Sequence, residues 1–339
     1  MASIDTHPLA DDYRALTESC GLLDRSERGK LALTGAGAVE FLGGQVTNEL
    51  STLAAGEGCY AAFLTHKGKM LGDLRILAVA SSDGQAPLEL LLDTERSTLQ
   101  ALFDMIRRFK IGYEVELHKR TVERGLLSLI GPDAERVVGL AANAGASQLG
   151  TAEHSNVALK IDGIDALAVR TDVGVDLLCD AADTAALSAA LVERGARPVS
   201  EDAAECLRVE RGRPRYGVDL DDTVIPQEAA LNERAVSFTK GCYVGQETVA
   251  RLFYKGKPNR HLRGLKLSAP VASGAELRLG ERVVGHVGRS VDSPRLGPIA
   301  LALVRREAAP GDRLDVIDEG SAGADGDVTA EVVELPFDS

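Results

Sequence analysis

The sequence contains no tryptophan, and aromatic residues make up only 4% of its 339 residues. Because stacking platforms for nucleic-acid bases are built from aromatic side chains, this scarcity argues against a broad one. No apolar run approaches the roughly 20 residues that a membrane-spanning helix needs, so we expect no membrane contact. The polar and acidic stretch at 1–14 has no signal-peptide pattern. These absences predict a soluble cytoplasmic protein.

Closely spaced cysteine or histidine pairs, which commonly hold metals, are also missing. The five cysteines are odd in number, widely spaced and without a Cys-x-x-Cys pair: Cys20, Cys59, Cys179, Cys206 and Cys242. Such spacing predicts reduced thiols and argues against a disulfide framework or a structural zinc site. The six histidines form no His-x-His or His-x-x-x-His pair, so no metal site is predicted.

Acidic residues outnumber basic ones by 51 to 38, a formal net charge of −13, while 45% of the residues are apolar. This apolar content is enough for a core and excludes a mainly disordered chain. Basic charge is nevertheless concentrated in 240–266, which holds seven cations and a single acid, and in 207–217. These segments indicate an anionic ligand such as a polyglutamate tail, a phosphate or RNA. A solvated surface is the alternative.

The order β-α-β-β-α-β can be read twice along the first two thirds of the chain. In the first copy, a strand at 70–80 precedes a helix at 94–109 that Thr94 would cap. In the second copy, a strand at 126–131 opens the unit, a helix at 133–143 follows it, and a helix at 181–194 lies near the end of the unit. This order is the split βαβ, or ferredoxin-like, pattern.

From Leu262 onward, short strands are separated by glycine- and proline-rich turns. Such regular turn signals predict a small antiparallel barrel. The sequence therefore predicts an α+β fold with two ferredoxin-like units and a C-terminal antiparallel β-barrel. We place the units at 1–119, 120–258 and 259–339, with the first two intertwined.

The segment Lys-Gly-Cys-Tyr-Val-Gly-Gln-Glu begins at Lys240 and has the highest density of candidate functional residues. Cys242 lies just before a helix expected from Gln246, with Lys240 two residues earlier. A helix N-terminus and a nearby cation both favour thiolate over thiol, so Cys242 is a candidate reactive cysteine. The alternative is a small packing residue, as free cysteines often are.

Two carboxylates are further candidates. Glu210 lies among four arginines, where it could form an intrahelical ion pair or accept two parallel hydrogen bonds from an amino-pyrimidinone edge. Asp73 stands at the start of an otherwise apolar strand. It is either exposed at the strand end or buried beside a ligand amine, where it could accept a proton.

The segment starting at Lys240 resembles the signature of the YgfZ-type folate-binding proteins, relatives of the glycine-cleavage T-protein, an aminomethyltransferase. Further segments resemble this family from about residue 25 to residue 337: Thr47-Asn48-Glu49, 207–220, Ile225-Pro226-Gln227-Glu228, Val284-Gly285-His286-Val287, 293–303, Pro310-Gly311 and Leu335-Pro336-Phe337. Residues 90–97 lack the asparagines that the T-protein has after a strand, and the T-protein lacks the cysteine motif. The YgfZ branch is therefore the better match.

The resemblance implies three domains around a central channel for tetrahydrofolate. Glu210 would hold the pterin ring, Asp73 would lie near the reactive folate nitrogen, and Cys242 would be the functional cysteine. The resemblance also implies residues that line or brace the site: Lys240, Tyr243, Gln246 and Arg251. The ligand is expected to be tetrahydrofolate or a one-carbon-substituted folate, with or without a polyglutamate tail.

Three functions follow as hypotheses. The first is a tetrahydrofolate-binding protein that supports assembly or maintenance of iron–sulfur enzymes, with effects on tRNA modification and with iron–sulfur client or assembly proteins as partners. The second is a folate-dependent aminomethyl- or methyltransferase in which Asp73 and Glu210 act. The third is an RNA- or protein-binding scaffold without folate, whose main surface is the basic segment 240–266. Whether the protein catalyses turnover stays open at this point.

Overall fold

The computed structural model describes residues 8–80, 88–140, 148–317 and 328–337. Two compact units are formed, each from two stretches of chain. The first unit contains Met1–Ser200 and Glu233–Gln246, and the second contains Glu201–Asn232 and Glu247–Ser339.

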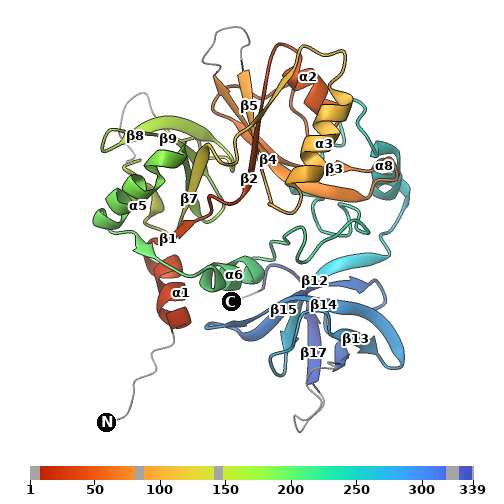
Figure 1. Ribbon diagram of the computed structural model, residues 1–339. Helices are drawn as coiled ribbons and strands as arrows, with labels where there is room; N and C mark the ends of the chain where they lie inside the picture. Colours follow the sequence, from red (N-terminus) through yellow and green to blue (C-terminus); the bar gives the residue numbers. More distant parts are fainter. Residues whose placement is uncertain (1–7, 81–87, 141–147, 318–327, 338–339) are drawn as a thin grey trace, which may run out of the picture. The chain divides into compact units, whose positions relative to one another are not determined.

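One half of the first unit is a five-stranded sheet of order β3-β4-β5-β2-β6. Its strands are β2 (Gly29–Thr34), β3 (Gly58–Leu64), β4 (Met70–Ala80), β5 (Leu88–Thr94) and β6 (Glu116–Lys119). Helices α2 (Ala38–Gly43) and α3 (Leu99–Phe109) cover one face of this sheet (Figure 1). Apart from the edge strand β3, the strand order is the one that a β-α-β-β-α-β unit produces.

The other half is a six-stranded sheet of order β11-β1-β7-β10-β9-β8. Its strands are β1 (Gly21–Asp24), β7 (Arg124–Ile130), β8 (Asn156–Ile161), β9 (Ile164–Arg170), β10 (Gly174–Asp180) and β11 (Arg197–Pro198). Its helices are α1 (Pro8–Glu18), α4 (Ala134–Val138), the 3₁₀ turn η1 (Ala181–Asp183) and α5 (Thr184–Glu193). Because β1 precedes the whole five-stranded sheet yet pairs with β7 and β11, the chain starts in one sheet, builds the other and returns.

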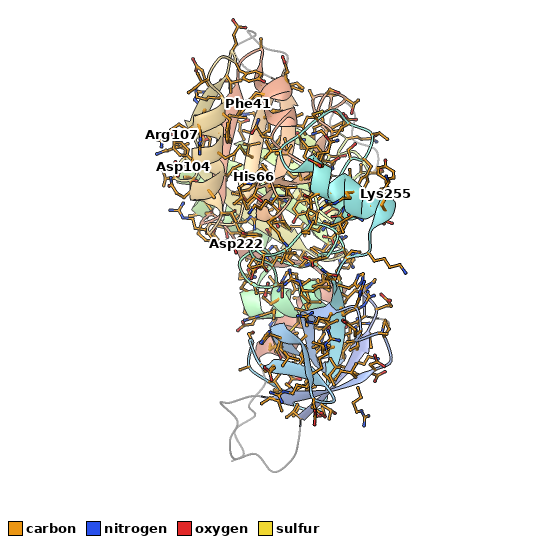
Figure 2. The ribbon with its side chains drawn as sticks, turned by 90° about the vertical axis from the view of Figure 1, so that its right-hand side faces the viewer. Phe41, His66, Asp104, Arg107, Asp222 and Lys255 are labelled. Carbon is orange, nitrogen blue, oxygen red and sulfur yellow. The ribbon has the colours of Figure 1, made fainter. Side chains whose placement is uncertain are left out.

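Both faces of strand β4 are buried, and each face packs against a different part of the first unit. Leu74 and Ile76 point into the core beneath α2 and α3, which also contains Phe41 of α2 (labelled in Figure 2). On the opposite face, Leu77 packs against Leu178 of β10 in an apolar cluster shared by the two sheets. Since side chains alternate along a strand, Asp73 shares the face of Leu77 and therefore faces the second sheet.

The second unit contains a closed antiparallel barrel of order β12-β15-β14-β13-β16-β17. Its strands are β12 (Arg260–Leu267), β13 (Glu276–Leu279), β14 (Arg282–Ser293), β15 (Gly297–Arg305), β16 (Arg313–Ile317) and β17 (Val328–Val333). The pairing of β17 with β12 closes it. Helix α6 (Glu201–Glu210) packs on the barrel through Val209, which is buried with Leu262 and Phe337. Helix α7 (Asn232–Ala235) lies in the first unit except for Asn232, and α8 (Gln246–Lys255) lies in the second unit except for Gln246.

The predicted α+β fold with a C-terminal antiparallel barrel is confirmed, with one helix start corrected. The helix expected at 94–109 begins only at Leu99, after Thr98. Thr94 is not its cap, because it ends β5 and its hydroxyl donates to the Asp73 carbonyl oxygen. Of the helix expected at 133–143, residues 134–138 form α4 and residues 141–143 lie outside the described residues. The domain limits at 119 and 258 stay predictions.

Candidate functional site

Asp73 is a buried carboxylic acid, with 6% of its surface exposed. The Tyr60 hydroxyl, from the neighbouring strand β3, donates to Asp73 Oδ2 at 2.7 Å. Burial raises the pKa of Asp73 to about 6, although the hydrogen bond from Tyr60 acts in the opposite direction. Of the two alternatives left by the sequence, the exposed strand end is therefore wrong. Asp73 is an acid that titrates close to neutral pH.

Tyr60 is itself surrounded by side chains that sequence reasoning did not select. The Arg234 guanidinium lies 5.1 Å from the centre of the Tyr60 ring and is paired with Glu153 at 2.6 Å. The His154 ring lies 6.4 Å from the Tyr60 ring, and burial lowers the pKa of His154 to about 4. At neutral pH the histidine is uncharged, whereas Arg234 is a cation beside the Tyr60 ring, and the charge of Arg28 acts on both Tyr60 and Asp73.

A second buried carboxylate, Asp93 of β5, has the opposite electrostatic setting. Arg28 Nε donates to Asp93 Oδ1 at 2.9 Å, and Arg75 Nε donates to Oδ2 at 2.6 Å. The two guanidinium groups outweigh burial and lower the pKa of Asp93. Arg75 also donates to Asp176 of β10 at 2.5 Å, so this network joins the two sheets next to Asp73.

The Thr47-Asn48 pair ties the turn after α2 to the segment around α7. The Thr47 hydroxyl donates to the Ala235 carbonyl at 2.5 Å and accepts from the backbone N–H of Ala62 at 2.9 Å. The Asn48 amide donates to the carbonyls of Tyr60 and Arg234, at 2.9 and 3.3 Å. The motif therefore holds Tyr60 and Arg234 together through their backbones.

Lys240, the first residue of the cysteine motif, holds the same turn. Its ammonium donates to three backbone carbonyls, those of Gly43 at 2.6 Å, Val46 at 2.8 Å and Asn48 at 2.7 Å. Burial lowers the pKa of Lys240 to about 8. An ammonium has three hydrogens, so none remains to donate to the Cys242 sulfur. The sequence places the lysine charge near the thiol, but the hydrogen bonds of the ammonium group go to the turn.

The rest of the motif is held by its backbone. The Val244 N–H donates to the Gly44 carbonyl at 3.2 Å. Gly245 has a φ of +85°, and a Cβ there would lie 2.5 Å from the Thr65 carbonyl oxygen, so this position requires glycine. Tyr243 is buried, with the Lys240 ammonium 5.1 Å from its ring centre, and Gln246 begins α8.

Cys242 is exposed, unlike the other four cysteines, all of which lie in the described part of the chain. Cys20, Cys179 and Cys206 are buried, and Cys59 is half-buried. Burial raises the pKa of Cys20 to about 11 and those of Cys59 and Cys206 to about 12, which keeps these thiols protonated. The packing alternative for Cys242 is therefore wrong, and this thiol is the accessible one.

Glu210, the last residue of α6, is buried in the second unit, with 3% of its surface exposed. The Ser293 hydroxyl donates to its Oε1. Arg295 donates to its Oε2 through Nη2 at 3.1 Å and Nε at 3.3 Å. These two donors come from the barrel, and the sequence reasoning named neither of them.

Several of the cations in the two basic segments are held inside the fold. Arg208 pairs with Glu205 and Asp219, and Arg260 with Glu228. Others of these cations are exposed, on α8 and after it: Arg251, Lys255 (labelled in Figure 2), Lys257 and Lys266. The basic surface is therefore smaller than the residue count indicates.

Two wider searches of the described residues gave negative results. None of the helices there is both long and apolar enough to cross a bilayer. No group of three or more histidine, cysteine, aspartate or glutamate residues in the described ranges could hold a metal ion.

Comparison with known families agrees with the fold. The model of the GCVT N-terminal domain matches residues 3–240, and the glycine cleavage T-protein C-terminal barrel domain matches residues 260–338. The chain belongs to the glycine cleavage T-protein family. The resemblance to the T-protein family is thus confirmed, and the YgfZ-type branch stays a prediction.

Individual members of the T-protein family are similar over almost the whole chain. The aminomethyltransferases of Symbiobacterium thermophilum and Rubrobacter xylanophilus are 31% and 30% identical to it. The alignments cover 96% of this chain and 88% and 85% of the two relatives. The crystal structure of the glycine cleavage system aminomethyltransferase T from Bartonella henselae has the same fold. Its TM-score is 0.83 at 24% identity, with 97% of this chain and 89% of that chain covered.

Asp73→Asn is expected to be more stable than the wild type at pH 7. The folded pKa of about 6 exceeds the ordinary value of about 4, so ionisation between these pH values disfavours the folded state. The gain should approach at most about 3 kcal/mol above pH 6 and vanish near pH 4. Urea unfolding at several pH values measures it, with exposed Asp165→Asn as control. A pH-independent difference between Asp73→Asn and wild type would contradict the burial argument.

Lys240→Met should lower the free energy of unfolding by about 2 kcal/mol or more, because three partly buried carbonyls lose their donor. Lys257→Met is the matched control, since Lys257 is exposed and its loss should change the stability by less than about 0.5 kcal/mol. Urea denaturation of both variants checks this. Equal stability of the two variants would show that the turn does not depend on Lys240.

Proposed function

We propose that this protein binds tetrahydrofolate and that Asp73 acts as an acid–base group in one-carbon chemistry on it. The observation that carries the proposal is the buried Asp73 carboxyl, with a pKa of about 6 and a hydrogen bond from Tyr60. A group with such a pKa is largely ionised at pH 7 and can still be protonated there, which suits proton transfer. The names of the similar relatives, all aminomethyltransferases, support the same chemistry.

The two buried carboxylates, one in each unit, have different chemical properties. Glu210 is a buried carboxylate whose oxygens already accept from donors on the barrel, so this site is built to receive N–H groups. Asp73 is suited to a position beside an amine, because its carboxylate can accept a proton that the amine releases. Tyr60 fixes the orientation of Asp73, and Arg234 supplies positive charge next to the pair.

Within this function, aminomethyl transfer is the candidate that the relatives favour. The aminomethyl carbon would form bonds to two folate nitrogens, and its bonds to the amino nitrogen and to the carrier atom of the donor would break. The two protons released by the folate nitrogens would end on ammonia and on the free carrier, and Asp73 would hold one of them during the transfer. Glu210 would hold the ring and take no part in proton transfer.

Asp73→Asn is expected to lower kcat for methylenetetrahydrofolate formation by about a hundredfold or more while changing KM little, because it removes acid–base catalysis. The assay follows product from tetrahydrofolate and an aminomethyl donor, under reducing and oxygen-free conditions. Asp165→Asn serves as the control for mutating a carboxylate remote from the pair. Wild-type protein that binds folate but forms no product would reject aminomethyl transfer.

A second candidate function, support of iron–sulfur enzymes as in YgfZ-type proteins, is favoured by the exposed Cys242. Its segment is fixed at one end by Lys240 and at the other by Gly245, so the thiol is displayed at a defined place. Aminomethyl transfer as outlined above makes no use of this thiol. A partner protein or its sulfur would reach Cys242 without local unfolding.

Cys242→Ala should abolish the rescue of iron–sulfur enzyme activity in cells that lack this protein and leave tetrahydrofolate binding nearly unchanged. The reason is that the proposed partner chemistry needs the exposed sulfur, whereas folate binding does not. Cys59→Ala, which removes a half-buried thiol with a raised pKa, is the control and should still rescue. Full rescue by Cys242→Ala would eliminate the role proposed for this cysteine.

A further inference from the structure

Ser293 and Arg295, which both donate to the Glu210 carboxylate, differ in how firmly they are held. Ser293 is buried, and its hydroxyl oxygen accepts from the backbone N–H groups of Arg295 at 3.1 Å and Leu296 at 3.0 Å. Its one hydrogen goes to Glu210 Oε1, so the serine is saturated and fixed. The Arg295 side chain is 39% exposed and follows the end of β14, at Ser293. Part of its surface is therefore already in contact with solvent, unlike that of the buried serine.

The Arg295 guanidinium also has the same donor pattern as the proposed ligand. A guanidinium carries N–H groups on nitrogens that share one carbon, and a carboxylate accepts them in parallel. A 2-amino-4-oxo-pyrimidine edge likewise presents an amino N–H and a ring N–H on nitrogens that share one carbon. The ring edge and Arg295 would therefore compete for the same oxygen, Oε2 of Glu210.

We propose that Arg295 is an internal competitor that holds Glu210 in the free protein and gives up its place when a 2-amino-pyrimidinone ring binds. This inference rests on the proposed folate binding and adds a residue, Arg295, that regulates the affinity for the ring. Taking a cation away from a buried carboxylate is costly, so Arg295 stabilises the free protein. The same contact must be broken on binding, so Arg295 lowers the affinity for the ring. Ser293 keeps the carboxylate oriented in both states.

Arg295→Ala should bind tetrahydrofolate about three- to tenfold more tightly than the wild type, because a partly exposed ion pair no longer has to be broken. Its free form should unfold at a lower temperature, since Glu210 loses its partner. Calorimetric titration under reducing, oxygen-free conditions measures the affinity, with 6-methyltetrahydropterin as a second probe that lacks the anionic tail. Both probes should show the gain.

Three controls make each result decisive. Arg263→Ala removes an arginine that is paired with Glu334 on the same barrel, and it should leave the affinity unchanged. Glu210→Gln should lose at least tenfold, which confirms the binding position. Arg295→Gln repeats the test with a smaller structural change if Arg295→Ala does not fold.

The outcomes separate this inference from the proposed function. Wild-type binding together with equal or weaker binding by the Arg295 variants would overturn the competitor role and leave folate binding intact. Absence of binding by folded wild type and folded Arg295 variants alike would overturn both. Binding by the Arg295 variants that exceeds wild-type binding for both probes is the result that we expect.

Discussion

The buried network around Asp93 is the interaction on which the first unit depends. One carboxylate of β5 is held by Arg28 and Arg75, and Arg75 continues to Asp176 on the other sheet. Charged groups are kept in such a place only when they are paired and hydrogen-bonded. The network therefore fixes how the two sheets face each other, and it sets the surroundings in which Asp73 lies.

Asp73 and Asp93 show how one sheet gives two carboxylates opposite properties. Two guanidinium groups lower the pKa of Asp93, which stays ionised and structural. Asp73 accepts a hydrogen bond from the neutral hydroxyl of Tyr60, and burial outweighs this bond, so its pKa rises to about 6. Such divergence between neighbouring acids marks the one that is available for proton transfer. The two carboxylates are thus distinguished by their partners.

Local patterns were enough to predict the arrangement of strands and helices, because alternation and helical spacing are properties of short segments. The same reasoning failed at Thr94, where a good capping residue serves instead as the end of a strand. Motif resemblance selected Asp73, Glu210 and Cys242, but it could not supply their environments. Ser293 is 83 residues from Glu210 in the sequence, and such contacts exist only after folding.

The most direct test of the account is the titration of the Asp73 carboxyl itself. Carbon-13 NMR of the aspartate carboxyl carbons in wild-type protein would follow it, with Asp73→Asn used to assign its signal. We expect a midpoint near pH 6, because burial outweighs the hydrogen bond from Tyr60. A midpoint near the ordinary value of about 4 would mean that Asp73 is well solvated. That result would contradict the acid–base role on which the proposed function rests.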